Sequence, residues 1–147
     1  MKLQTSTMLA LYSVLEAASQ PDKQVSASEI AERYGVSAHH LAKVLRELGR
    51  AGLVDSSRGV GGGYRFSGNA RRLTLMDVIE RFEDIGARSA EAGAAHTDLG
   101  LTITRVLSEI DEIAKATFRS ITIDTLLKLV ERERRTPPAL PASVGRD

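Results

Sequence analysis

The stretch "RGVGGGYRF" (58–66) poses the first question about this chain, because it places four glycines within five positions. Three kinds of structure use such a run: a phosphate-binding loop of an enzyme, a flexible linker, and the tip of a hairpin. A phosphate-binding glycine loop follows a strand and opens a helix, yet no helix is predicted after Gly63. Tyr64 and Phe66 instead resume the two-residue spacing of a strand at once, which also argues against a linker. The glycines are therefore predicted to form the tip of a hairpin.

Two helical segments precede this hairpin. "SASEIAERYG" (26–35) begins with a capping-box pattern, in which Ser26 and Glu29 can each satisfy a backbone group of the other. "VSAHHLAKVLRELG" (36–49) has Ser37 as its N-cap and an apolar stripe at helical spacing. Two short helices joined by a tight turn indicate a helix-turn-helix, although a generic helical hairpin would give the same pattern. The β-prone runs "LVDSS" and "YRFSG" on either side of the glycines favour the first, because a helix-turn-helix followed by a hairpin is a winged helix.

Helices are also predicted on both sides of this unit. The N-terminal segment (3–19) has helical spacing, with an inward face that carries Met8, Leu11, Tyr12, Leu15 and Ala18. After the hairpin, Thr74 precedes Asp77 by three residues, which is a second capping signal, and the apolar residues of a short helix follow. Residues 1–83 are therefore predicted to form one winged helix-turn-helix domain.

The rest of the chain has a different pattern. Residues 84–98 are small, polar and aperiodic, which predicts a loop. From residue 99 apolar residues recur at spacings of three and four over about twenty residues, more than the winged domain can cover, so a second copy of the same helix is the expected partner. The residues predicted to make this dimer contact are Ile103, Val106, Leu107, Ile110, Ile113, Ala114 and Phe118. A last helix completes residues 99–135, and the proline-broken tail (136–147) is predicted to be disordered.

Composition sets the broad class of the protein. With 147 residues, 42% of them hydrophobic and 27% charged, the chain fits a globular fold. It has no apolar run long enough to cross a bilayer and no signal-peptide pattern, which predicts a cytoplasmic protein without a membrane partner. The absence of cysteine excludes disulfides and thiolate metal sites.

Charge is divided unevenly along the chain. Residues 1–72 contain ten Lys or Arg and six Asp or Glu, a balance of +4, whereas residues 73–147 contain ten and thirteen, a balance of −3; together they give the net charge of +1. A basic first half is a weak indication of a polyanionic partner, because lysine and arginine release counterions when they neutralise phosphates.

With these elements in order, the sequence resembles the Rrf-two family of bacterial transcription regulators, which includes the iron–sulfur cluster regulator and the cysteine-metabolism repressor. The resemblance covers residues 1–130 and is most specific in "RGVGGGYRFSGNARRLTLMDVIE" (58–80) and "SITIDTLL" (120–127). It implies a mainly α fold with a small β-hairpin wing, and a long helix through which two chains pair. It also implies binding to partly palindromic operators on double-stranded DNA.

One departure from the family concerns its cofactor. Many members hold an iron–sulfur cluster through three cysteines in the loop before the long helix, and the corresponding loop here (84–98) has none. His96 lies near the position of a ligating histidine in relatives but out of register with it. Because cluster ligation depends on thiolates, we predict no cofactor and no metal. A cluster-binding parent whose cysteines had been replaced by engineering would have the same loop. The sequence is therefore compatible both with a naturally cysteine-free protein and with an engineered one.

The predicted DNA contacts lie on the second helix of the helix-turn-helix and on the wing. The start of that helix points into the major groove in such domains, and the wing arginine with its flexible glycines suits a narrow minor groove. The predicted contact residues are Ser37, Ala38, His39, His40, Lys43, Arg46, Arg58, Gly59, Gly61 and Tyr64. Solvent exposure without contact is the alternative at each position, and for the two adjacent histidines so is a metal pair, which their ~100° separation on a helix disfavours. Thr5 and Thr7 are candidates for further phosphate contacts.

These observations predict a sequence-specific DNA-binding transcription regulator that acts as a homodimer without an iron–sulfur cluster. A repressor is favoured over an activator, although the sequence leaves both open. The alternative is a winged-helix module that docks a partner protein. An enzyme is the weakest hypothesis, because the three histidines have no evident nucleophile or carboxylate partner. The effector, a small molecule or a protein, is not identified by the sequence.

Overall fold

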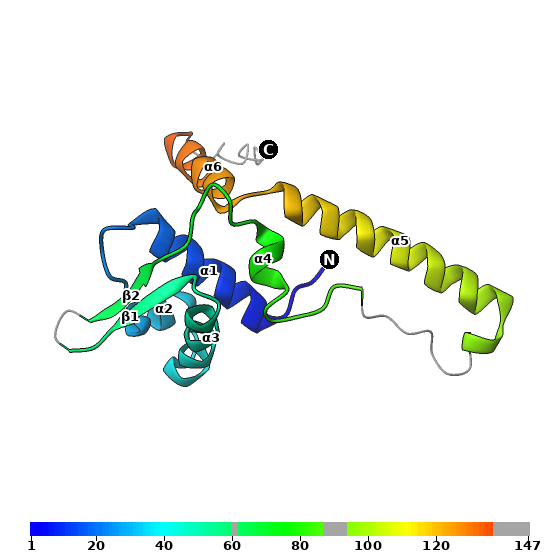
Figure 1. Ribbon diagram of the computed structural model, residues 1–147, viewed down its shortest axis with the longest axis horizontal. Helices are drawn as coiled ribbons and strands as arrows, with labels where there is room; N and C mark the ends of the chain where they lie inside the picture. The colour runs from blue at the N-terminus through cyan, green and yellow to red at the C-terminus, as the bar shows by residue number, and fades with distance from the viewer. Residues whose placement is uncertain (60–61, 87–93, 137–147) are drawn as a thin grey trace, which may run out of the picture.

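A computed structural model of the chain describes residues 1–59, 62–86 and 94–136 (Figure 1). The elements in chain order are α1 (Thr5–Ser19), α2 (Ala27–Tyr34), α3 (Ala38–Arg50), β1 (Val54–Ser57), β2 (Gly63–Phe66), α4 (Leu75–Ile79), a 3-10 turn (Ala94–His96), α5 (Asp98–Ser120) and α6 (Ile123–Arg135). Helix α1 runs through the body of the molecule, with α3 on one side of it and α6 on the other (Figure 1). Helix α5 projects from this body as a long arm. The fold is therefore mainly α with a β-hairpin wing, which confirms the predicted fold class.

Local capping sets most of the helix boundaries. The Ser37 hydroxyl accepts a hydrogen bond from the His40 amide at 3.1 Å and starts α3, while Gly35 ends α2 with φ of 63°. Thr74 and Asp77 form both halves of a capping box at the start of α4. At Ser26 only one half of the predicted box is present: its hydroxyl accepts from the Glu29 amide. The capping signals in the sequence thus located the helix starts correctly, although Ser26 lacks the return bond.

The wing contains a third extended segment that the sequence did not reveal. β1 and β2 pair antiparallel from Val54↔Phe66 to Ser57↔Gly63. Val25, between α1 and α2, joins the outer side of β2 through two backbone bonds to Tyr64, of 2.7 and 2.8 Å. A Cβ on Gly63 would lie 2.7 Å from the Val25 carbonyl oxygen, so this close approach requires glycine.

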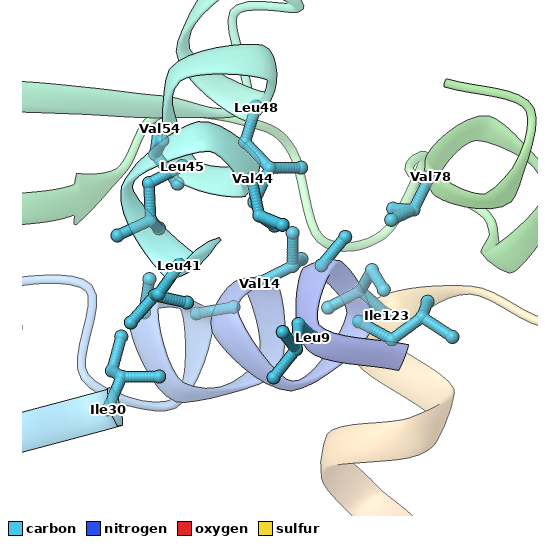
Figure 2. Close-up of a cluster of buried hydrophobic side chains, with 14 of the residues drawn as sticks. Leu9, Val14, Ile30, Leu41, Val44, Leu45, Leu48, Val54, Val78 and Ile123 are labelled. Atoms are coloured by element: carbon cyan, nitrogen blue, oxygen red, sulfur yellow. The ribbon is translucent and has the colours of Figure 1, made fainter. Parts of the chain in front are cut away.

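The core forms where α1 meets α3, α4 and α6 (Figure 2). Fully buried side chains from each of these elements converge there: Leu9 and Val14, then Leu41, Val44, Leu45 and Leu48, then Val78 and Ile79, and Ile123. The predicted single inward face of α1 is wrong in detail. Met8, Tyr12 and Leu15 are only partly buried, whereas small residues such as Ala10 and Ala17 are fully enclosed. Because α1 is covered on several sides, its pattern is that of a central helix rather than of a surface helix.

The α5–α6 junction is fastened to the winged domain through its backbone. The Leu75 amide donates to the Ile121 carbonyl at 2.9 Å, and the Ile123 amide donates to the Leu73 carbonyl at 2.8 Å. Thr74 and Thr122, each the N-cap of its helix, face each other in an isolated bridge. The end of α5 nearest the body therefore has a fixed position relative to α3 and the wing.

Thr7 carries a buried hydroxyl without a hydrogen-bond partner among the described residues. Replacing Thr7 with valine keeps the shape of the side chain and removes the unsatisfied group. We expect the free energy of unfolding to rise by about 1 kcal/mol, since a buried hydroxyl without a partner costs roughly 1–3 kcal/mol. Chemical denaturation measures this change. Ser13→Ala is the control, because the equally buried Ser13 hydroxyl donates to the Leu9 carbonyl at 2.7 Å and its loss should give no gain. A less stable Thr7→Val protein would contradict the prediction.

A polar cluster joins α1 to α2 on the surface. The Glu16 carboxylate accepts hydrogen bonds from Arg33 at 2.5 Å and from the Tyr34 hydroxyl at 2.7 Å. Burial opposes the ionisation of Glu16, but the bonds from Arg33 and Tyr34 outweigh it and hold its pKa below the ordinary value. Burial, together with the bond to Glu16, raises the pKa of Tyr34 to about 12. The carboxylate is therefore the protonation state of Glu16 that stabilises the α1–α2 contact.

Glu16→Gln is expected to lower the free energy of unfolding by about 1 kcal/mol at neutral pH. Because the pKa of Glu16 is lower in the folded state, its stabilising contribution is present above the unfolded pKa and is lost as pH falls through the folded one. The difference between wild type and variant should therefore shrink below about pH 4. Denaturation at pH 7 and pH 3 checks this. Glu47→Gln is the control, since Glu47 pairs with Arg50 only at 3.7 Å on an exposed surface; an equal Glu16→Gln difference at both pH values would contradict the prediction.

Two predicted segments lie largely outside the described residues. The predicted disordered tail has only Thr136 inside them, and the predicted loop 84–98 has 84–86 and 94–98, where a 3-10 turn precedes α5. Within the described ranges, no helix combines the length and the apolar character that crossing a bilayer requires.

Candidate nucleic-acid interface

The first part of α3 presents its polar side chains to solvent. Ala38, His39, Lys43 and Arg46 are exposed, while the opposite face of the helix is the core stripe that begins at Leu41. This orientation follows from the 3.6-residue period, because a helix that buries one face must expose the other. Four of the predicted contact residues on α3 are thus accessible from one side.

Ser37 and His40 are engaged within the chain. The Ser37 hydroxyl caps α3, and His40 is only partly exposed. Its Nε2 lies 3.0 Å from the Ser6 hydroxyl of α1 and shares a hydrogen bond with it. The contact joins the first turn of α1 to the first turn of α3. It thereby gives His40 a role in positioning α3 that the sequence did not indicate, whereas the capping role of Ser37 was predicted.

Helix α3 and the wing enclose one surface hollow of about 700 Å³. Its lining includes Arg46 of α3, Arg58 at the end of β1 and Tyr64 of β2. The hollow also contains one carboxylate, Asp55. Two arginines twelve positions apart in the sequence therefore line the same concave surface, and they do so because the hairpin folds back beside the helix.

The tip of the wing depends on glycine. Arg58 is exposed where β1 ends, and Gly59 has φ of 99°, a conformation that side chains with a Cβ rarely adopt. A Cβ on Gly62 would lie 2.6 Å from the Ser57 carbonyl oxygen. Gly61, a predicted contact residue, lies outside the described residues. The described part of the tip is a tight turn that leaves the Arg58 side chain free to extend.

The apolar stripe of α5 divides between two faces of the helix. Five exposed residues follow each other at spacings of four, three, four and three, and between 49% and 79% of each is accessible: Leu99, Ile103, Val106, Ile110 and Ile113. We call these five residues the α5 seam. Their spacing is that of the contact positions in a coiled coil. The sequence-based prediction included four of them and omitted Leu99.

The other predicted dimer residues turn toward their own chain. Leu107 and Ala114 are partly buried, and Phe118 packs against the core of the body. At ~100° per residue, their face is centred about 80° around the helix from the α5 seam. Near the body, one face of α5 therefore packs against its own chain while the face that carries the seam stays exposed.

Of the two other predicted phosphate contacts, only Thr5 is exposed. Thr7 is completely buried, so the expectation that it contacts a phosphate is wrong. It lies on the core side of α1, which periodicity alone did not indicate.

Comparison with known proteins agrees with this fold. Residues 3–129 match the family described as Rrf2 (Rrf-two), iron-dependent transcriptional regulator. BadM of Rhodopseudomonas palustris, which is named as an HTH-type transcriptional regulator, is 53% identical over 135 residues, covering 92% of this chain and 86% of BadM.

Solved structures show the same architecture. CymR, the global cysteine regulator of B. subtilis, superposes with a TM-score of 0.73 at 24% identity, covering 88% of this chain and 98% of CymR. IscR of T. potens superposes with a TM-score of 0.73 at 25% identity, covering 95% of this chain and 94% of IscR. The family and BadM are named as regulators of transcription, and the chain is accordingly not an enzyme. It belongs to the Rrf2 family of transcriptional regulators.

Proposed function

We propose that the protein is a repressor that binds a partly palindromic DNA operator as a homodimer. The observation that supports this most directly is the hollow between α3 and the wing, which presents Arg46 and Arg58 on one surface. In this proposal the exposed start of α3 enters the major groove, with Lys43 and His39 nearest the bases or their flanking phosphates. Arg58 reaches the adjacent minor groove, where a narrow A·T-rich sequence concentrates negative potential.

The α5 seam supports the homodimer. Five large apolar side chains on one face of an exposed helix form a surface that soluble proteins normally cover. A second α5 with the same spacing matches it by symmetry, since a two-fold contact uses the same patch on both chains. Because the α5–α6 junction is fastened to the winged domain, pairing at α5 would hold two copies of α3 at a fixed separation. Two copies of α3 related by a two-fold axis would match an operator whose two half-sites are related by the same symmetry.

The residues present do not fit an iron site, although the family is described as iron-dependent. The chain has no cysteine to supply thiolates. Among the residues that the structure describes, no three histidine, aspartate or glutamate side chains are grouped so that they could hold a metal ion. The proposed mechanism therefore contains no step that depends on iron.

Selection of bound sequences from random double-stranded DNA tests the proposal. We expect enrichment of an inverted repeat whose half-sites lie about one helical turn, or a multiple of it, apart. An A·T-rich segment should lie where each wing reaches the minor groove. If no sequence is enriched at physiological salt, the repressor hypothesis fails and the protein-docking alternative takes its place.

Lys43→Ala is expected to weaken operator binding, and the pattern of the loss identifies what Lys43 contacts. A uniform loss on all sequences with a smaller salt dependence indicates a phosphate contact, whereas relaxed preference at one base pair indicates a base contact. Lys128→Ala is the matched control, because Lys128 lies on α6 and pairs with Asp124 at 2.7 Å. Titrations at two salt concentrations measure both variants. Unchanged binding by Lys43→Ala on every sequence would remove this residue from the interface.

A further inference from the structure

A groove of about 280 Å³ lies between α1, the end of α2 and α6. Its lining consists of Tyr12, Leu15, Glu16, Ser19, Tyr34, Leu127, Val130 and Arg134. Helix α6 lies on the side of α1 away from α3 (Figure 1), and no residue of the groove belongs to the α5 seam or to the hollow beside the wing. The groove would therefore stay open in a DNA-bound dimer. A second hollow, near residues 83–86, includes Ile110 of the seam, so pairing of α5 would cover part of it.

The lining of the groove is mainly aromatic and aliphatic. The rings of Tyr12 and Tyr34 stack in parallel, with 4.6 Å between centroids and 4° between planes. Leu15, Leu127 and Val130 add aliphatic surface around them. The volume is close to the lower end of the range for small-molecule sites, about 300–1,000 Å³. Such walls suit a compact ligand with a planar apolar part.

The carboxylate of the groove is already satisfied, which leaves its guanidinium available. Both oxygens of Glu16 are occupied, one by Arg33 and one by the Tyr34 hydroxyl. Arg134 also lines the groove and acts on Glu16 through its charge. Within the described part of the chain, however, Arg134 forms no ion pair, whereas the neighbouring Arg135 pairs with Glu131 at 3.1 Å. The groove is thus lined by one carboxylate and one guanidinium. Because Arg33, from outside the lining, pairs with Glu16, the Arg134 guanidinium is available to an anion.

We propose that this groove binds a small organic anion with a planar apolar body, which stacks beside the tyrosine pair while Arg134 holds its charged group. Because guanidinium forms paired hydrogen bonds with planar anions, a carboxylate or sulfonate is the charged group that fits best.

The position of the groove connects it to DNA binding, a step that depends on the proposed function. A ligand in this groove would contact α6 on one side and the α1–α2 pair on the other. Helix α6 starts at the α5–α6 junction, where Ile123 is fully buried in the core. A ligand can shift α6 only if it binds the two arrangements with different affinity, and the effect is then reciprocal. If the anion changes the affinity of the dimer for its operator by some factor, then operator DNA must change the affinity of the dimer for the anion by the same factor.

The test uses two fluorescent probes that differ by one charged group, the anion 8-anilinonaphthalene-1-sulfonate and the neutral N-phenyl-1-naphthylamine. We expect the anion to bind saturably and to be sensitised by tyrosine excitation, since two of the three tyrosines line the groove and the chain has no tryptophan. Arg134→Gln should weaken the anion roughly tenfold and leave the neutral probe unchanged. Arg132→Gln is the control on the same helix, because Arg132 does not line the groove.

Two results would overturn the site. One is anion binding by Arg134→Gln equal to that of wild type, and the other is loss of the anion signal in Ile110→Asp/Ile113→Asp, which would locate the probe at the α5 seam. Operator titrations with and without the anion then test the coupling. Groove binding without any change in operator affinity would overturn the regulatory role while leaving the site, and failure of the protein to bind any operator would instead reject the proposed function.

Discussion

Replacing both Ile110 and Ile113 with aspartate is expected to give a folded monomer that no longer binds operator DNA specifically. Both side chains are more than half exposed in the single chain, so the substitutions remove little packing from the body. In a paired seam they would instead place like charges against each other in an apolar contact, which is strongly unfavourable. Binding should fall to the nonspecific level, a loss of about 10³-fold or more.

Sedimentation and operator titration measure the two effects together. Leu101→Asp is the matched control, because Leu101 is an exposed leucine of the same helix that lies about 160–180° away from the middle of the α5 seam. It should remain dimeric and bind DNA as wild type does. The seam hypothesis fails if the wild-type protein is monomeric at micromolar concentration, or if Leu101→Asp is as disruptive as the double variant.

Arg58→Ala is expected to weaken binding most at operators with an A·T-rich minor groove beneath the wing. Its guanidinium stands exposed at the turn beside the hollow that Arg46 also lines, and it would respond to groove width through the electrostatic potential. The expected loss is about 1–3 kcal/mol, or roughly 5- to 150-fold in affinity. The measurement compares two operators that differ only beneath the wing.

Arg119→Ala controls for the loss of one positive charge, since Arg119 is exposed on α5 outside the proposed DNA surface. It should change neither the affinity for the two operators nor the ratio between them. If Arg58→Ala binds both operators as wild type does, the wing does not contact DNA and the glycine run serves only as a turn.

Much of the fold could be predicted from the sequence, because the signals involved act over three or four residues. Ser37 caps α3 and Thr74 caps α4 through bonds to the amide three positions later, and any chain with these residues there can form them. The same holds for the wing, since Gly59 and Gly62 are required by backbone geometry within the turn itself. The order of elements, and with it the winged helix, follows from such local signals.

Contacts between distant segments could not be predicted in this way. Val25 pairs with Tyr64, and Ser6 bonds His40, because packing of α1 against α3 brings these residues together rather than because of any pattern near them. The same applies to Thr7, whose threonine identity suggests a surface position but which the core encloses. Sequence spacing also merged the two apolar faces of α5 into one stripe.

The same distinction between local signals and long-range contacts applies to the candidate site. The exposed side of α3 and the position of Arg58 follow from helical period and turn geometry, which the sequence by itself determined. Only the tertiary structure decided that Arg46 and Arg58 share a hollow, that Leu99 belongs to the α5 seam, and that Arg134 and the tyrosine pair line one groove. These pairings depend on how whole helices pack, and packing is set by the sum of many weak long-range contacts that no short stretch of sequence contains.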